Sequence, residues 1–388
     1  MDSKNIIELE KQYIMQTYGR FNLIIDKGKG CYLFDKDGNR YLDLVGGLAT
    51  ASIGYGNKEF AEALSEQAEK LVNATNLFYT EQQAVLAEKL AKLSGLKKSF
   101  FSNSGSEANE VAIKLARKYT KNTEIISTEK AFHGRTFGAL TATWNKKYKD
   151  YCRPLVPDFK HVPYNDAEAL EKAVTGKTAA FIVEPIQGES GIIVPDDDYL
   201  KQVREICDKK NILFIADEIQ TNMRTGKFFA YQHNKVLPDI ATVAKGIAGG
   251  VPIGITIAKK EVADAFEKGE QGSTFGGNSL SCAAANFVID LAMKNKLIDN
   301  AKNMGDYFFK RLNDLDKNSI KEARGKGLML GVELNKESKK VVELCLKKKL
   351  LVNKCTDSVI RFLPALIIKE KEIDEAIDIL ASVFEGAG

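Results

Sequence analysis

Short apolar runs alternate with amphipathic stretches of helical length through the middle of the chain. Between the runs, apolar residues recur with the helical period, as in Glu107–Tyr119 and Tyr199–Lys209. Alternation of this kind is typical of a parallel or mixed α/β sheet. The apolar runs that we expect to form its strands are Ser99–Ser102, Glu124–Ser127, Ala179–Val183, Ile212–Ala216, Ile240–Ala244 and Ile255–Ala258.

The two ends of the chain follow other patterns. Residues 1–45 indicate a short helix and then a hairpin, with Cys31–Phe34 and Tyr41–Leu44 on either side of an Asp-Gly turn. From about residue 284 onward, helical patterns mix with short strands, and the chain ends with the amphipathic stretch Glu370–Phe384. We therefore expect three parts: an N-terminal segment (1–47), a large α/β domain (48–283) and a small α+β C-terminal domain (284–388).

Composition and charge exclude several classes of protein. The 388 residues are 44% hydrophobic and 28% charged, as in ordinary globular proteins. The net charge is only +4 and both signs are interspersed, which argues against a nucleic-acid partner. Six scattered cysteines and three histidines form neither a disulfide framework nor a metal-ligand spacing. No run reaches the roughly 18 apolar residues of a membrane span. We expect a cytoplasmic protein without a metal site or membrane anchor.

A segment that combines glycine with serine follows the first apolar run of the sheet. Ser104-Gly105-Ser106-Glu107 ends a strand and begins a helix, and the free amides of such a helix end bind phosphate well. The spacing of Ser104 and Glu107 also fits a capping box that satisfies only its own helix end. The sequence leaves both interpretations open.

Two charged residues follow later runs, at the sheet edge where open α/β sheets bind ligands. Asp217 comes after an apolar stretch, so its carboxylate needs a partner, which a metal, a protonated ring nitrogen or a helix end would provide. Lys245 ends the next run, where a partly desolvated amine has a lowered pKa and can attack an aldehyde. A solvated strand end is the alternative for Lys245.

Two arginines lie beside apolar or aromatic residues in a chain that uses mostly lysine. Arg135 and Arg361 are each suited to clamp a carboxylate with two hydrogen bonds, and a structural ion pair is the alternative. His133, close to Arg135, is expected to be a satisfied structural residue. A phosphate cradle, a strand-end acid, a strand-end lysine and two arginines together match pyridoxal 5′-phosphate with an amino acid and a keto acid.

Six motifs in one order extend this interpretation over nearly the whole chain. The chain resembles the class III, or omega, aminotransferases of fold type I. Within this class, its length and the residues around Arg135 and Arg361 are most similar to members that use N2-acetylornithine. The motifs that carry the resemblance are Ser102–Asn109, Phe132–Thr136, Glu184–Glu189, Asp217–Gln220, Ala244–Gly246 and Ser273–Asn278.

The resemblance implies a homodimeric enzyme that binds pyridoxal 5′-phosphate. Lys245 would hold the cofactor as a Schiff base and move the proton, and Asp217 would keep the pyridine nitrogen protonated. Gln220 would bind the ring oxygen, and Phe132 would stack on the ring. The phosphate would be bound by Gly105 and Ser106, with Thr274 from the partner subunit.

The resemblance also implies a site for two substrates. Arg361 would clamp the α-carboxylate of glutamate and 2-oxoglutarate, and Arg135 a second carboxylate or that of acetylornithine, with Ser273 nearby. Glu189 would pair with Arg361 while the ω-amino substrate is bound and swing away for glutamate. The loop Asn222-Met223-Arg224 is one residue shorter than usual and lacks the family's glycines, so we expect it to be reshaped.

Other functions fit the same sequence. Related enzymes act on ornithine, 4-aminobutyrate, succinylated ornithine or diaminopimelate, or lysine carried by another molecule. An aminomutase would use the same cofactor, but Arg361 and Glu189 suit a cycle with two substrates. A binding module without catalysis has no chemical reason to keep Lys245, Asp217 and both arginines.

Overall fold

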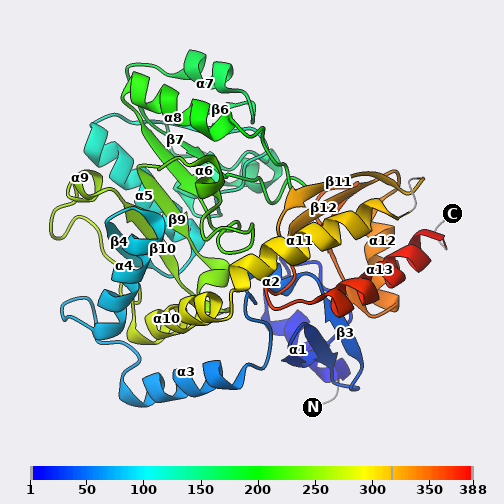
Figure 1. Cartoon of the computed structure of the whole chain (residues 1–388). Helices are drawn as coiled ribbons and strands as arrows, with labels where there is room; N and C mark the ends of the chain where they lie inside the picture. Colours follow the sequence, from blue (N-terminus) through cyan, green and yellow to red (C-terminus); the bar gives the residue numbers. More distant parts are fainter. Residues whose placement is uncertain (1–2, 316–317, 386–388) are drawn as a thin grey trace.

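The computed structural model describes residues 3–315 and 318–385, which form a large part and a smaller part (Figure 1). Its strands are β1 (Ile25–Lys29), β2 (Tyr32–Asp35), β3 (Arg40–Asp43), β4 (Lys98–Ser102), β5 (Glu124–Thr128), β6 (Phe159–Val162), β7 (Thr178–Val183), β8 (Leu213–Asp217), β9 (Ile240–Val243), β10 (Gly254–Ala258), β11 (Ile320–Lys326), β12 (Met329–Leu334), β13 (Leu350–Leu351), β14 (Asn353–Lys354) and β15 (Val359–Phe362). Its helices are α1 (Ser3–Tyr13), α2 (Gly46–Ala49), α3 (Lys58–Lys70), α4 (Glu81–Ser94), α5 (Gly105–Thr120), α6 (Phe137–Ala142), α7 (Ala167–Ala173), α8 (Tyr199–Lys210), α9 (Lys260–Ala263), α10 (Ser279–Lys294), α11 (Leu297–Asn313), α12 (Ser338–Lys347) and α13 (Glu370–Glu385).

The large part is built on the widest sheet of the described residues, which has the strand order β4-β10-β9-β8-β7-β5-β6. β10 is antiparallel to both of its neighbours, and the pairs from β9 to β6 are parallel. The expected mixed α/β sheet is therefore confirmed. Because β4 runs in the same direction as β9, the carboxyl ends of β4, β9, β8, β7 and β5 meet at one edge.

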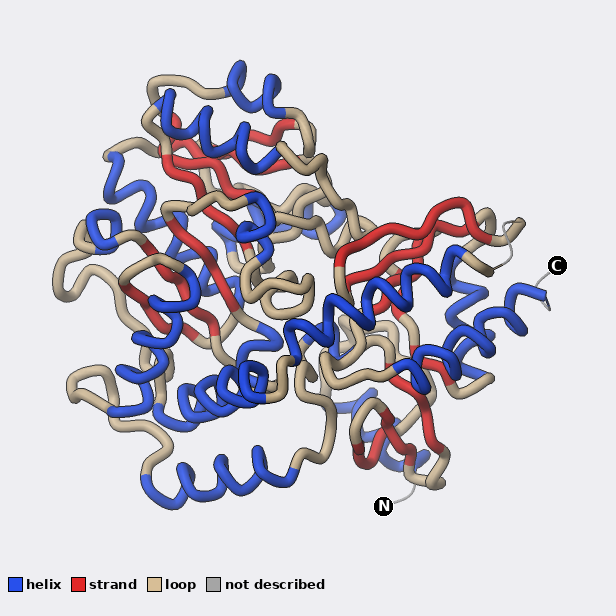
Figure 2. The backbone as a smooth tube through the Cα atoms, viewed as in Figure 1, coloured by secondary structure: helices blue, strands red, loops and turns tan. Residues whose placement is uncertain are grey.

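The apolar runs are the buried strands of this sheet. Every residue of β5, β7, β8 and β9 is buried, as expected for parallel strands covered on both faces. Phe181 on β7 and Phe214 on β8 are fully buried, and burial of each side chain contributes roughly 1.5–3 kcal/mol to stability. Figure 2 shows helices on both sides of these strands.

The helices that cover the sheet begin and end at residues suited to those positions. α5 packs on β7, β9 and β10, and α8 packs on β8. The hydroxyl of Ser104 caps α5 by accepting from the Glu107 amide, at 3.2 Å. α8 ends at Asn211, whose left-handed φ of 54° suits a helix C-cap.

The small part joins both ends of the chain. β11, β12, β15 and β14 form one sheet, against which α11 and α12 pack. β1, β2 and β3 form a second sheet, completed by β13 in parallel with β3. The N-terminal hairpin is therefore hydrogen-bonded to the C-terminal region.

The division into three parts stays a proposal. Its boundary at residue 283 falls inside α10. This helix packs on α3 and α4, which precede it in the chain, and on α11, which follows it.

Among the helices of the described ranges, none is long and apolar enough to cross a membrane.

Candidate active site

A cavity of about 340 Å³ opens at the edge of the large sheet where the parallel strands end. Its lining includes Asn103 after β4, Glu184 after β7, Asp217 at the end of β8 and Lys245 after β9. The residues that the sequence places after separate apolar runs thus line one cavity, because the strands share a direction.

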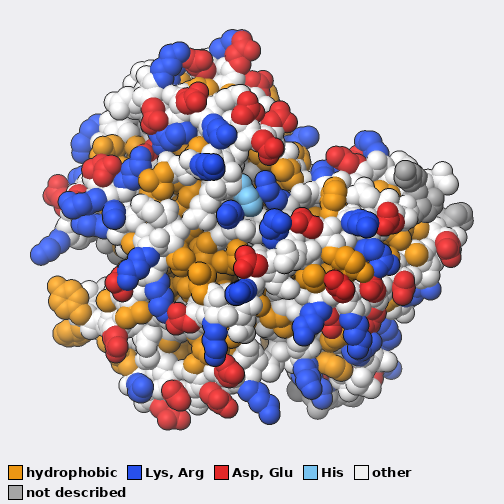
Figure 3. All heavy atoms as spheres, viewed as in Figure 1, with side chains coloured by type: hydrophobic (Ala, Val, Ile, Leu, Met, Phe, Trp, Pro, Cys, Tyr) orange, Lys and Arg blue, Asp and Glu red, His pale blue; other side chains and the backbone are white. Residues whose placement is uncertain are grey.

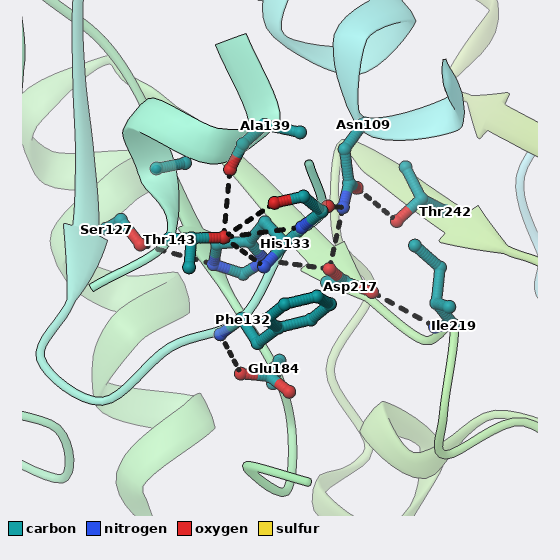
Figure 4. Close-up of polar contacts among 12 residues, drawn as sticks. Asn109, Ser127, Phe132, His133, Ala139, Thr143, Glu184, Asp217, Ile219 and Thr242 are labelled. Atoms are coloured by element: carbon teal, nitrogen blue, oxygen red, sulfur yellow. Dashed lines mark hydrogen bonds and ion pairs between the residues drawn. The ribbon is translucent and has the colours of Figure 1, made fainter. Parts of the chain in front are cut away.

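Asp217 lies at the centre of a buried polar network (Figure 4). Its Oδ2 accepts hydrogen bonds from His133 Nδ1 at 2.7 Å and from Asn109 Nδ2 at 2.8 Å. Its Oδ1 accepts from the Ile219 amide at 3.1 Å. Three donors from three segments therefore fix the orientation of this carboxylate.

The two side chains that hold Asp217 are themselves held. His133 Nε2 lies 3.2 Å from the Ser127 hydroxyl, so the ring is engaged on both sides. Asn109 also donates to the His133 carbonyl at 2.7 Å and accepts from Thr242 on β9 at 2.8 Å. His133 is a satisfied buried residue, as expected, and it also positions the candidate acid. This role of Asn109 could not be inferred from the sequence.

Ser104 caps the helix end beside the cavity, as its sequence predicts, and phosphate binding there stays a prediction. Besides the cap from Ser104, the Glu107 carboxylate accepts from the Asn103 amide, so the capping interactions are present. The first turn of α5 still leaves the amides of Gly105 and Ser106 without an acceptor inside the helix. Both residues line the cavity.

Lys245 begins a 3₁₀ turn, η4 (Lys245–Ala248), which Ala244 separates from the end of β9. Its φ of 53° lies in the left-handed region, which costs a residue other than glycine about 1–3 kcal/mol and is common at functional sites. The preceding carbonyl, of Ala244, accepts from Asn222 Nδ2 at 3.3 Å. Burial lowers the pKa of Lys245, against the opposing effect of Glu189, and so favours the free amine.

These residues fit the chemical groups of pyridoxal 5′-phosphate. The cavity offers an amine for an aldehyde, a fixed carboxylate for a protonated ring nitrogen, and free amides for a phosphate. The backbone approaches closely there: a Cβ on Gly105 would lie 2.8 Å from Ile219, and one on Gly134 would lie 2.2 Å from the Ser106 hydroxyl. Phe132 also lines the cavity, and its expected place on the ring face stays a prediction.

Arg361 is almost fully buried and is engaged by a carboxylate. Its Nη1 donates to Glu189 at 2.7 Å and to the Gln220 side-chain oxygen at 3.0 Å, and its Nη2 donates to Asn353 at 2.7 Å. Gln220 also donates to Glu189, at 3.2 Å. Burial alone would raise the pKa of Glu189, but Arg361 and Lys245 outweigh it and lower the pKa to about 2. Glu189 therefore remains a carboxylate at neutral pH.

A second cavity, of about 780 Å³, adjoins the first at Phe132 and is lined by Glu189 and Tyr148. Arg135 lines neither cavity. Its guanidinium is exposed and stacks on the ring of Tyr148, with Cζ 3.6 Å from the ring centroid. The structure thus separates the two arginines, with Arg361 buried and Arg135 at the surface.

Ser273 and Thr274 lie outside the lining of the first cavity in the same chain. The Ser273 hydroxyl accepts from Asn103 at 3.3 Å and from the Gly276 amide at 2.9 Å. The Thr274 carbonyl accepts from Asn73 at 3.3 Å. The role of Thr274 in the site of a partner subunit stays a prediction.

Two further residues of this region received no role from the sequence. Glu184 accepts from the amides of Phe132 at 3.1 Å and Gly188 at 3.2 Å, and burial raises its pKa to about 7. Asn353 holds the outer nitrogen of Arg361. Glu184 follows a strand and belongs to a recognised motif, whereas Asn353 belongs to none of the motifs.

The loop that departs from the family pattern lies next to the site. Met223 takes a left-handed φ of 61° and is fully buried, although glycine adopts this backbone with less strain. Arg224 is also buried, and its Nη1 donates to the Leu328 carbonyl at 3.1 Å. In the ranges that the structure covers, no three His, Cys, Asp or Glu side chains group as metal ligands.

Comparison with known proteins gives full-length matches. The family model described as "Aminotransferase class-III" matches residues 13–384. The acetylornithine aminotransferase of Methanocaldococcus jannaschii is 47% identical over 99% of both chains. A structure of the Toxoplasma gondii ornithine aminotransferase, with partial occupancy of PLP at its active site, has a TM-score of 0.96, 33% identity and coverage of 99% of this chain and 94% of that one. The Elizabethkingia anophelis acetylornithine aminotransferase has a TM-score of 0.89 and 33% identity, and each chain is fully covered.

Proposed function

This chain belongs to the class III aminotransferases, and we propose that it transfers the δ-amino group of N2-acetylornithine to 2-oxoglutarate. The products are N-acetylglutamate 5-semialdehyde and glutamate, which places the reaction in arginine biosynthesis. The observation that carries the choice of donor is the full-length similarity to enzymes named for acetylornithine, at 47% identity. The ornithine and acetylornithine aminotransferases of known structure are both 33% identical to this chain, so these two structures do not separate the donors.

Class III aminotransferases depend on pyridoxal 5′-phosphate, which supplies an aldehyde for the amino group and a ring that accepts electrons from the neighbouring carbon. We assign its covalent attachment and the proton transfer at the reacting carbon to the Lys245 amine. Asp217, held by His133 and Asn109, stabilises the positive charge of a protonated ring nitrogen. The Gly105 and Ser106 amides bind the phosphate at the start of α5. Gln220 and Phe132 hold the ring.

The two substrates require two states of the same pocket. When Glu189 pairs with Arg361, as it does here, the charge of Arg361 is neutralised. The ω-amino end of acetylornithine, which carries no carboxylate, can then lie beside Arg361. Glutamate and 2-oxoglutarate carry an α-carboxylate that replaces Glu189 on Arg361. Arg135 binds the side-chain carboxylate of glutamate and 2-oxoglutarate, and it binds the single carboxylate of acetylornithine. One site therefore serves an ω-amino donor and an α-keto acid in turn.

Replacing Arg361 with lysine tests this assignment of carboxylates. We expect kcat/KM for 2-oxoglutarate and glutamate to fall about 10- to 100-fold, because an ammonium cannot make the two-pronged contact. The value for acetylornithine should fall less, since Arg361 is paired with Glu189 when that donor binds. Steady-state kinetics with each substrate varied in turn measures the difference.

Arg40 provides the matched control, because it pairs with Glu375 at the surface, at 2.8 Å, far along the chain from the site. Arg40→Lys should leave kcat/KM unchanged for acetylornithine and for 2-oxoglutarate. Equal losses for donor and acceptor in Arg361→Lys would contradict the two-state pocket.

We further propose that the enzyme is a homodimer whose sites are shared. Phe78 and Phe275 are 67% and 62% exposed, and Asn76 joins their segments by donating to the Ser273 carbonyl at 3.1 Å. Figure 3 shows hydrophobic side chains gathered over the loop between α3 and α4. A second copy that covers this surface would bring Thr274 against its partner.

We also propose a cytoplasmic location. The six cysteines are all free, which fits a reducing cytoplasm.

A further inference from the structure

Arg135 is a cation whose side chain contacts rings and no acid. The described residues offer it neither an ion pair nor a side-chain hydrogen bond, and its guanidinium lies over Tyr148, with Cζ 3.6 Å from the ring centroid. The ring of Phe132 is farther away, with its centroid at 5.7 Å. The charge of Arg135 is therefore free for an anionic ligand, and its position depends on Tyr148.

Tyr148 contacts both Arg135 and Phe132. Its ring meets the Phe132 ring edge-on, with centroids 6.2 Å apart and planes at 90°. It also lines the second cavity together with Phe132 and Glu189. A flat ring fixes the plane of a guanidinium stacked on it, which is the property that a two-pronged carboxylate contact needs.

The segment that carries Tyr148 is anchored to the loop that carries Arg135. Tyr148 ends a 3₁₀ turn, η1 (Lys146–Tyr148), and the next residue, Lys149, is buried and donates its ammonium to the Thr143 carbonyl. The Thr143 hydroxyl accepts from the amides of His133 at 2.9 Å and Gly134 at 3.3 Å. Figure 4 shows Thr143 beside His133. Tyr148 and Arg135 therefore belong to one hydrogen-bonded unit.

We propose that Tyr148 is the positioning residue for Arg135, and that it thereby sets the affinity for the substrate carboxylate farthest from the reacting carbon. This inference rests on the proposed function for the identity of the donor. In acetylornithine that group is the α-carboxylate, and in glutamate it is the side-chain carboxylate. Tyr148 acts on recognition and leaves the chemical step unchanged.

The test compares Tyr148→Leu with Tyr148→Phe. Leucine removes the ring face, so we expect kcat/KM for acetylornithine to fall about three- to tenfold, mostly through KM, as for loss of a cation–π contact. Phenylalanine keeps the ring and should stay within about twofold of the wild type. Acetylputrescine, which is acetylornithine without its carboxylate, should react equally well with all three proteins. Tyr151→Leu is the matched control, because Tyr151 is 80% exposed in the same segment.

A double-mutant cycle separates positioning from general packing. In an Arg135→Ala background, Tyr148→Leu should cause no further loss, because its target is gone. Equal losses in both backgrounds, or equal losses for acetylornithine and acetylputrescine, would overturn the proposal. A wild-type enzyme that rejects acetylornithine would refute only the donor. The same cycle with glutamate, which also carries a distal carboxylate, would then decide the role of Tyr148.

Discussion

Replacing Lys245 with alanine is expected to lower kcat by at least about 10⁴-fold, because one residue supplies both the attacking amine and the proton transfer. The loss should be the same for every amino donor, since all of them use this step. Lys245 lines the cavity, and its burial lowers the pKa of the amine, as this chemistry requires. Steady-state rates with acetylornithine and with glutamate measure the effect.

The fold should survive this change, because the Lys245 side chain makes no hydrogen bond or ion pair among the described residues. Sedimentation should give twice the chain mass of 42.9 kDa for the variant and the wild type. Lys268→Ala is the control, because Lys268 is exposed and its replacement should leave kcat unchanged. Borohydride should fix the cofactor covalently to the wild type and not to the variant. Undiminished turnover by Lys245→Ala would refute the mechanism.

Replacing Asp217 with asparagine should lower kcat about 10²- to 10³-fold, the usual loss when one preorganised electrostatic contact is removed. Asparagine has nearly the same shape, so the change removes the charge more than the packing. Because a protonated ring nitrogen is needed in both halves of the cycle, amino donors and keto acids should be affected alike. Single-turnover absorbance changes with acetylornithine and with 2-oxoglutarate measure each half separately.

Asp239 is the control for this variant, because it is a second buried carboxylate at the start of β9. It pairs with Arg204 at 2.8 Å and Lys259 at 2.7 Å, outside the cavity. Asp239→Asn should lower the melting temperature without lowering kcat of the folded enzyme. A similar loss of kcat in both variants would mean that Asp217 acts through stability alone.

Most of the large sheet could be predicted from the sequence because β5, β7, β8, β9 and β10 are buried along their whole length. The runs from Ser99 to Ala258 read as continuous apolar segments, and β4, β5, β7, β8, β9 and β10 all lie within a residue or two of them. β6 was missed because Phe159–Val162 includes Lys160 and His161 and is only partly buried. β1 was missed for the same reason, since Ile25–Lys29 is mostly exposed.

Contacts distant along the chain could not be predicted. The parallel pairing of β13 with β3 joins Leu350 to Leu42, and two-residue strands leave no periodic signal. Asn353 reaches Arg361 only because β14 and β15 are paired. The contacts of Tyr148 with Arg135 depend in the same way on how two loops fold together.

The site was more predictable than these contacts because chemistry restricts it to the ends of strands. Asp217 and Lys245 follow separate apolar runs and line one cavity. The resemblance to class III aminotransferases, which the family match confirms, supplied the roles. The hydrogen bonds from His133 and Asn109 to Asp217 became visible only in the structure, because three segments must meet to form them.

The choice of donor is tested most directly by the visible absorbance of the purified holoenzyme as single donors are added without a keto acid. Acetylornithine and ornithine form the critical pair because they differ only by the acetyl group, and 4-aminobutyrate, succinylornithine and lysine complete the series. We predict that acetylornithine gives the fastest change at the lowest concentration and that 2-oxoglutarate reverses it. A faster response to any other amine, or none to acetylornithine, would contradict the proposed function.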